Sequence, residues 1–488
     1  MNGFVSFVGA GPGDIGLITE KGIRCIEKAD VILYDRLVNP RLLRYANGNC
    51  EFIYCGKLPN RHVMRQEMIN VALVEYALKG LRVVRLKGGD PSVFGRVGEE
   101  AEAVKEANIN YEIVPGVTSS IAAASYAGFP VTHREYSTSF TVRTGHYCNN
   151  NANYNREKDE HGDTIAYYMG VKNLPHHCEH LIKEGLSPET KVAVIEWATT
   201  GKQRTVVGTL STITNIVKDK NIQNPAMTLI GDVVSLREKL SWFEEKSLFG
   251  KRILIAKATS EDSELEQYLL GLGSEAYAFP TLKKEIVPLS VDDIEKVLKT
   301  EKLLITVPES VDILIDSLFG YGYDVRDLPR MIGCLTEKTL RALQSSGIRG
   351  TLVTELEEGM VVIGSQYGKQ SPHHPVSIVT HRLVRDERFT EVETRLIEED
   401  HWETIIFPNR ASVHTFIKEA KVLGLPLETL KFAYIGKSVK AYAEQHGFTE
   451  VDNEVQEELN KWLNNNRKLL SLKEKQKEYN PRVLQLSK

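Results

Sequence analysis

Two glycine-rich segments near the N-terminus place carboxylates beside flexible backbone, and each follows an apolar run typical of a buried strand. They are VGAGPGD at residues 8–14 and RLKGGDPSVFGR at residues 85–96. Glycine allows the backbone to approach a ligand closely, and Asp90 offers a carboxylate to a ribose hydroxyl or an ammonium group. A third strand-end turn, VPGVTSS at 114–120, adds exposed hydroxyls. Together the turns predict a ligand site, although KGGDP alone is equally well explained as a structural strand-to-helix turn.

The glycine spacing argues against a dinucleotide as the ligand. A dinucleotide-binding loop reads GxGxxG and directs a helix N-terminus at pyrophosphate. Here the glycines fall at 9, 11 and 13, Pro12 lies inside the turn, and Asp14 places a negative charge where a phosphate would be. Asp35, at the end of the second predicted strand, imitates the ribose-binding acid of such folds, so NAD is kept as a minor alternative. A rigid loop beside an acid better suits a cationic or neutral ligand.

Strands and helices alternate along the first part of the chain, which predicts an α/β fold. The helix at 18–29 has Thr19 near its N-cap, and after Pro115 longer polar connections between strands indicate a second lobe. The segment 149–163 is polar, has no apolar periodicity, and is predicted to be a loop. The predicted elements of the first lobe are strands at 4–10, 30–35, 82–90 and 111–116, and helices at 18–29, 64–80 and 97–108.

A new α/β series begins with the strand 251–258, after a boundary near 241–252. This series contains an internal repeat, because 305–348 and 405–448 each read as strand, helix, strand and helix. The repeat predicts two similar α/β subdomains with a cleft between them. We therefore expect a first domain at 1–246 with lobes at about 1–115 and 116–246, a second domain at 250–462, and a polar, solvated tail at 463–488.

The composition describes an ordinary globular protein. The chain has 488 residues, 42% hydrophobic and 26% charged, with a net charge of −4, so we expect no nucleic-acid partner. No stretch is long and apolar enough to span a bilayer, and the six cysteines form no CxxC pair, so we expect a cytoplasmic protein with reduced thiols and no membrane association. The cluster HHCEH at 176–180 has metal-ligand residue types, but it begins an ordinary helix and we expect no metal site.

The glycine turns belong to a longer series of motifs. With YDRLV (34–38), CGK (55–57), RHVMRQEMIN (61–70), TGH (144–146), YYMG (167–170) and TLIGDVVSLREKLSWF (228–243), they resemble the uroporphyrinogen-III C-methyltransferases of the tetrapyrrole methylase family. The resemblance covers residues 3–243 almost without gaps. Relatives that methylate rRNA or diphthine precursors share the glycine turns but not YDRLV or RHVMRQEMIN.

This resemblance implies a two-lobed α/β methylase that binds S-adenosylmethionine and releases S-adenosylhomocysteine. It implies methylation of uroporphyrinogen III at C2 and C7 to precorrin-2, in sirohaem or cobalamin biosynthesis, by a homodimer. Asp35 and Lys57 are implied as catalytic base and acid. The implied cofactor contacts are Pro12, Gly88, Gly89, Asp90, Val93, Thr118, Ser119, Met169 and Ala198. The eight carboxylates of the substrate call for cations, for which the candidates are Arg61, His62, Arg65, His133, Arg134 and His146.

Residues 250–462 resemble uroporphyrinogen-III synthases more weakly, and the resemblance lies in the internal repeat. The Ser/Thr turns of that family are altered here to TVPES and FPNRAS, and its tyrosine-bearing stretch is not identifiable. Three interpretations stay open: an active synthase, a decayed structural module, or a module that binds a tetrapyrrole and passes it to the first domain. The linker EEKSLFG at 244–250 is short, which favours a fixed or hinged relation between the halves. We expect residues 1–246 alone to keep methylase activity.

Overall fold

The computed structural model describes residues 3–56, 65–145, 163–353, 359–366, 378–423, 425 and 427–478, with the backbone alone at 366, 421–423 and 467–478. Four predicted site residues lie outside this part of the chain, as do residues 149–162 of the predicted polar loop. These four are Lys57, Arg61, His62 and His146.

The first lobe is a parallel five-stranded sheet in the order β3-β2-β4-β1-β5. Helices cover both of its faces, which explains why its inner strands read as continuous apolar runs. Helix α1 begins where Thr19 accepts a hydrogen bond from the Gly22 amide, as predicted. The elements are β1 (Phe4–Gly9), η1 (Ile15–Leu17), α1 (Glu20–Glu27), β2 (Val31–Tyr34), η2 (Pro40–Tyr45), β3 (Glu51–Tyr54), α2 (Gln66–Leu78), β4 (Arg82–Lys87), α3 (Val97–Glu106) and β5 (Asn110–Val114).

The second lobe is a mixed five-stranded sheet in the order β6-β7-β10-β8-β9. Only β6 and β7 run parallel, and the other three pairs are antiparallel. The elements are α4 (Ser119–Tyr126), β6 (Phe140–Thr144), β7 (Thr164–Tyr168), η3 (Val171–Asn173), α5 (Leu174–Lys183), β8 (Lys191–Glu196), β9 (Arg204–Thr209), α6 (Ile213–Asp219), β10 (Ala226–Ile230), η4 (Asp232–Leu236) and α7 (Arg237–Leu240).

The second half forms two further sheets, in the orders β12-β11-β19-β20 and β13-β18-β17-β14-β15-β16. The predicted internal repeat is confirmed, because β14-α10-β15-α11 and β19-α13-β20-α14 each pair their two strands in parallel. The elements are β11 (Arg252–Ala256), α8 (Glu264–Gly271), β12 (Glu275–Phe279), β13 (Leu282–Ile286), α9 (Val291–Lys299), β14 (Lys302–Ile305), α10 (Glu309–Gly320), η5 (Val325–Asp327), β15 (Met331–Cys334), α11 (Glu337–Ser345), β16 (Thr351–Leu352), β17 (Val361–Gln366), β18 (Ile378–Arg385), η6 (Glu387–Phe389), α12 (Thr390–Glu399), β19 (Thr404–Phe407), α13 (Arg410–Leu423), η7 (Leu427–Thr429), β20 (Lys431–Tyr434), α14 (Lys437–Glu444) and α15 (Asn453–Glu478).

The C-terminal helix differs from the expected polar tail. Helix α15 runs from Asn453 to Glu478, so the helix continues well into the segment predicted to be a solvated tail. This segment is rich in leucine, lysine, glutamate and glutamine, which are good helix formers. A polar composition therefore does not exclude a helix, and residues 463–478 continue α15.

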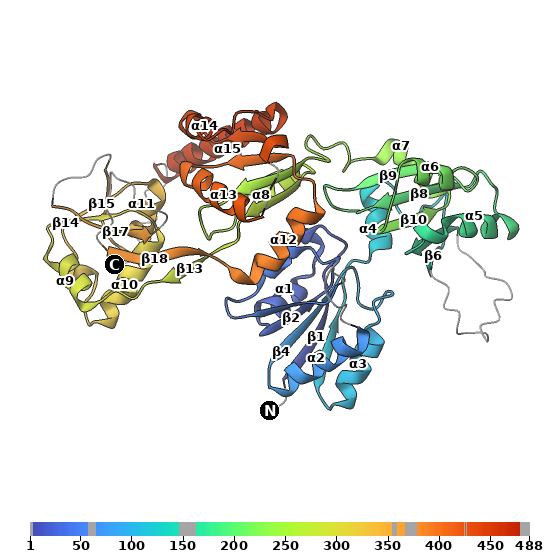
Figure 1. Cartoon of the computed structure of the whole chain (residues 1–488), viewed down its shortest axis with the longest axis horizontal. Helices are drawn as coiled ribbons and strands as arrows, with labels where there is room; N and C mark the ends of the chain where they lie inside the picture. The colour runs from blue at the N-terminus through green and yellow to red at the C-terminus, as the bar shows by residue number, and fades with distance from the viewer. Residues whose placement is uncertain are drawn as a thin grey trace.

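The two halves are packed against each other. Helix α12 lies beside the first-lobe sheet, although it belongs to the second half in sequence (Figure 1). Phe389 and Val392 are buried in one apolar cluster with Leu42 and Leu43 of the first lobe. Burial of apolar surface at this contact favours a fixed relation between the halves, one of the two relations that the short linker allowed.

Candidate active site

A cavity of about 950 Å³ opens at the carboxyl ends of β1, β2 and β4, and both lobes contribute to its walls. Ligands of parallel α/β sheets bind at this edge. Many of the residues predicted from sequence line it. These are Pro12, Asp35, Arg65, Gly88, Gly89, Val93, Ser119, Met169 and Ala198.

Close backbone packing explains the glycines of the three turns. Gly11 and Gly89 pair as an isolated bridge, with the Gly89 amide donating to the Gly11 carbonyl at 2.7 Å. A Cβ on Gly116 would lie 2.4 Å from the Gly89 carbonyl oxygen, and a Cβ on Gly9 would lie 2.6 Å from the Gly116 amide nitrogen. Side chains at these points would drive the three strand ends apart, so the turns form a cradle that only glycine can build.

Several non-glycine residues on the cavity wall have left-handed backbone conformations. Phe94, Met169 and Trp197 have φ values of 55°, 53° and 46°, and all three line the cavity. Such conformations are costly for residues with a Cβ and tend to occur at functional sites. Phe94 and Met169 also expose 44% and 41% of their surface, which leaves apolar groups available to a ligand.

A buried ionic cluster adjoins Asp35, and sequence reasoning did not identify it. Arg85 and Lys87 are two positions apart on β4, so their side chains point to the same side of the sheet. Arg85 donates to the Asp35 carboxylate at 2.6 Å and to Glu100 at 3.2 Å, and Lys87 contacts Glu100 at 2.8 Å. Asp35 keeps 32% of its side chain exposed, whereas Glu100 is fully buried. Arg85 therefore fixes the Asp35 carboxylate at the cavity edge.

The electrostatics of this cluster follow from burial and proximity. Burial lowers the pKa of Lys87, and the neighbouring Arg85 lowers it further. Burial also acts to lower the pKa of Arg85, but Asp35 and Glu100 outweigh burial and the net shift is upward. Arg85 is consequently a permanent cation, while Lys87 is the group in this cluster that releases a proton more readily than usual. The signal in the sequence was two basic residues two apart within a buried strand.

Other predicted residues are not among those that line the cavity. Asp90 accepts hydrogen bonds from the amides of Ser92, at 2.7 Å, and Gly116, at 3.0 Å, so its carboxylate shapes the glycine cradle. Thr118 precedes α4 and shares a hydrogen bond with the Tyr168 hydroxyl. His133 and Arg134 lie in the connection between α4 and β6, where His133 accepts from the Glu135 amide.

Asp14 also has a structural role in this protein. One of its carboxylate oxygens accepts from the Gly16 amide at 2.8 Å, and the other accepts from the Tyr126 hydroxyl at 2.7 Å. The Asp14 amide donates to the Thr199 hydroxyl of the second lobe at 3.0 Å. Asp14 thus joins the first glycine loop to the second lobe.

The histidine-rich helix forms no metal centre in the described part of the chain, where no group of three or more suitable ligands occurs. His177 is buried and stacks on Tyr167 with ring centroids 4.4 Å apart, and His180 contacts Glu184 at 3.2 Å. Within the described residues, no helix is both long and apolar enough to cross a bilayer.

Comparison with known proteins shows the family to which the chain is similar. Residues 5–214 match the family of tetrapyrrole (corrin/porphyrin) methylases. A uroporphyrinogen-III C-methyltransferase of Bacillus subtilis is 42% identical over 430 residues, covering 87% of this chain and 89% of the relative. One from Priestia megaterium is 56% identical over 244 residues, which are 48% of this chain and 99% of the relative. The porphyrin biosynthesis protein HemD of Ruminiclostridium josui is 33% identical over 483 residues, with 92% of this chain and 95% of the relative covered.

The fold and the site define an α/β enzyme with a cavity between two lobes and a glycine cradle on its first-lobe side. The chain belongs to the tetrapyrrole methylase family. Its similarity to a uroporphyrinogen-III C-methyltransferase and to a porphyrin biosynthesis protein extends over both halves of the chain.

Proposed function

We propose that this chain is an S-adenosylmethionine-dependent methyltransferase that converts uroporphyrinogen III to precorrin-2 by methylating C2 and C7. The observation that carries the proposal is the cavity in which the glycine cradle, Asp35 and the second-lobe residues Met169 and Ala198 meet. A product destined for sirohaem or cobalamin, a cytoplasmic location and the lack of a nucleic-acid partner are parts of the same proposal.

The residues present fit the cofactor. A Cβ at Gly9 or Gly116 would clash with neighbouring backbone, so glycine at these positions lets the strand ends that border the cavity pack closely together. Gly88, Gly89, Val93 and Ser119 on one side and Met169 and Ala198 on the other would hold the cofactor, which supplies an electrophilic methyl group when bound. Asp90 and Thr118 would support this cradle through their hydrogen bonds.

Asp35 is proposed as the general base. A pyrrole carbon that gains a methyl group must lose or relocate a proton, and a fixed carboxylate at the cavity edge can accept it. Arg85 holds the Asp35 carboxylate at 2.6 Å. Lys57 is proposed as the proton donor, and Arg61, His62, Arg65, His133, Arg134 and His146 as cations for the substrate carboxylates, on the basis of family resemblance.

The binding specificity tests the choice of cofactor. Titration calorimetry on the full chain should show stoichiometric binding of S-adenosylhomocysteine and no binding of NAD. With S-adenosylmethionine and uroporphyrinogen III supplied, a dimethylated product should appear that becomes fluorescent on oxidation. Binding of NAD in preference to S-adenosylhomocysteine would contradict the proposal.

For the second half, we propose formation of uroporphyrinogen III from hydroxymethylbilane, and the alternative is a decayed structural or tetrapyrrole-binding module. The support is the confirmed repeat of two parallel α/β units and the likeness to a porphyrin biosynthesis protein over 92% of the chain. The full chain, given hydroxymethylbilane without S-adenosylmethionine, should yield the type III isomer. Closure to the type I isomer alone would favour the decayed module.

We also propose a homodimer formed through the first half, on the basis of the family resemblance. Light scattering at micromolar concentration should give about twice the chain mass of 54.9 kDa. A monomeric mass at that concentration would contradict the proposal.

A further inference from the structure

The second half of the chain supplies part of the wall of the methylase cavity. Arg395, Leu396, Glu399 and Asp400, from α12 and the residue that follows it, line the cavity together with Glu275. The four residues at 395–400 lie more than a hundred positions beyond the predicted end of the methylase domain in sequence. A structural module that merely accompanied the first half would not need to enter its substrate cavity.

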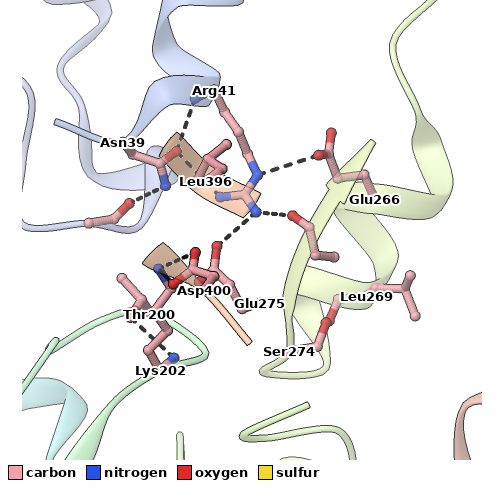
Figure 2. A network of polar contacts seen from close by, with 12 residues as sticks. Asn39, Arg41, Thr200, Lys202, Glu266, Leu269, Ser274, Glu275, Leu396 and Asp400 are labelled. Carbon is pink, nitrogen blue, oxygen red and sulfur yellow. Dashed lines mark hydrogen bonds and ion pairs between the residues drawn. The ribbon is translucent and has the colours of Figure 1, made fainter. Parts of the chain in front are cut away.

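Ion pairs fasten this wall to both lobes. The Lys202 ammonium of the second lobe contacts an Asp400 carboxylate oxygen at 2.5 Å, and Arg36 of the first lobe contacts Glu399 at 3.4 Å. Both acids at the end of α12 are therefore paired with cations, one from each lobe. The end of α12 joins the two lobes at the cavity wall. Figure 2 shows Asp400 beside Lys202, near the place where Arg41 meets Glu266 and Glu275.

Most cations of the cavity wall are already neutralised by carboxylates. Arg36, Arg41, Arg85, Lys87, Arg96 and Lys202 each form an ion pair. Within the described residues, Arg65 and Arg395 are the lining cations for which no carboxylate lies within ion-pair distance. A substrate with eight carboxylates requires cations that are free to pair with it, so these two arginines are suited to that role.

Arg395 is held in a geometry suited to a carboxylate. Its guanidinium lies over the Tyr54 ring at 4.2 Å from the centroid, and the residue is 7% exposed. Its Nη1 atom has no hydrogen-bond partner in the described part of the chain. The contact with the Tyr54 ring limits how the guanidinium can turn, and the unpartnered Nη1 is a donor that a carboxylate of the ligand could complete. Burying a cation whose hydrogen-bond donor has no acceptor costs free energy, and a ligand that supplies the acceptor removes this cost.

We propose that Arg395, from the second half of the chain, binds a side-chain carboxylate of the tetrapyrrole in the methylase cavity and so positions the substrate. This inference rests on the proposed function, because it takes uroporphyrinogen III as the substrate. It revises the expectation that residues 1–246 are self-sufficient, since the first half alone lacks this cation and the wall that carries it.

Steady-state kinetics of full-length variants tests the assignment. Arg395→Met should raise the KM for uroporphyrinogen III by about ten- to a hundredfold, the range expected for loss of a charged hydrogen bond. The kcat should stay within about twofold of the unchanged chain, and the Kd for S-adenosylhomocysteine, measured by calorimetry, should not change. Arg395→Lys should restore part of the affinity, because it retains the charge but not the guanidinium.

Arg388→Met provides the matched control. Arg388 also lies in the contact with the first lobe, where it donates to the Asn47 carbonyl at 2.7 Å, but it does not line the cavity. This variant should keep the original KM. An unchanged KM in Arg395→Met, or an equal rise in both variants, would overturn the assignment. If the unchanged chain itself fails to methylate uroporphyrinogen III, the proposed function fails, whereas an active chain with a normal KM in Arg395→Met contradicts only this inference.

Discussion

Replacing Asp35 by Asn should reduce turnover by about a hundredfold or more, which is the range that a positioned general base contributes. The amide is close in shape to the carboxylate but cannot accept the proton. Because Asp35 takes no part in the backbone packing that builds the glycine cradle, S-adenosylhomocysteine should bind with nearly unchanged affinity. The measurements are kcat with uroporphyrinogen III and calorimetric titration of S-adenosylhomocysteine.

Asp90→Asn is the matched comparison for this prediction. Asp90 accepts from two backbone amides that shape the cradle, so its replacement should weaken cofactor binding more than the chemical step. If both substitutions abolish cofactor binding alike, the division between a base and a cradle residue is wrong.

Glu100→Gln should destabilise the first-lobe sheet by about 3–5 kcal/mol, the cost of removing one partner from a buried ionic group. Glu100 is fully buried and accepts from Arg85, Lys87 and Gln66 through one carboxylate oxygen. Loss of its charge leaves Lys87 without a carboxylate partner and Arg85 with Asp35 alone. Hydrogen exchange of peptides that contain β4 measures the effect, because it reports local opening in a chain of several domains.

The control for this prediction is the adjacent residue. Glu99 forms an exposed ion pair with Arg96 on the surface of α3, and such pairs contribute about 0–1 kcal/mol. Glu99→Gln should therefore leave exchange of β4 almost unchanged. Equal protection in both variants would show that the buried cluster is not what stabilises the sheet.

Local chemistry explains which parts of the site the sequence could predict. The glycine turns and Asp35 follow buried strands directly, and the carboxyl ends of parallel strands meet at one edge, so these residues had to lie together. Thr19 as a helix cap and the repeated α/β units were predictable for the same reason, since each depends on neighbours in sequence.

The remaining parts depend on contacts between distant segments. Glu100 on α3 looks like an exposed helical acid until the packing of α3 on β4 buries it against Arg85 and Lys87. Asp90 and Asp14 carry the charge of ligand-binding acids, but backbone amides and a tyrosine hydroxyl take up their oxygens. Arg395 gave no local signal, because its role arises only when α12 packs against the first lobe.

The most direct test of the central claim is to follow the methyl group itself. The purified full chain would be given S-adenosylmethionine that carries a deuterated methyl group, with uroporphyrinogen III and total RNA present together, and all products would be analysed by mass spectrometry. We predict that the label enters the tetrapyrrole alone, at two methyl groups per molecule, as expected for methylation at C2 and C7. Label in RNA or protein with none in the tetrapyrrole would contradict the account.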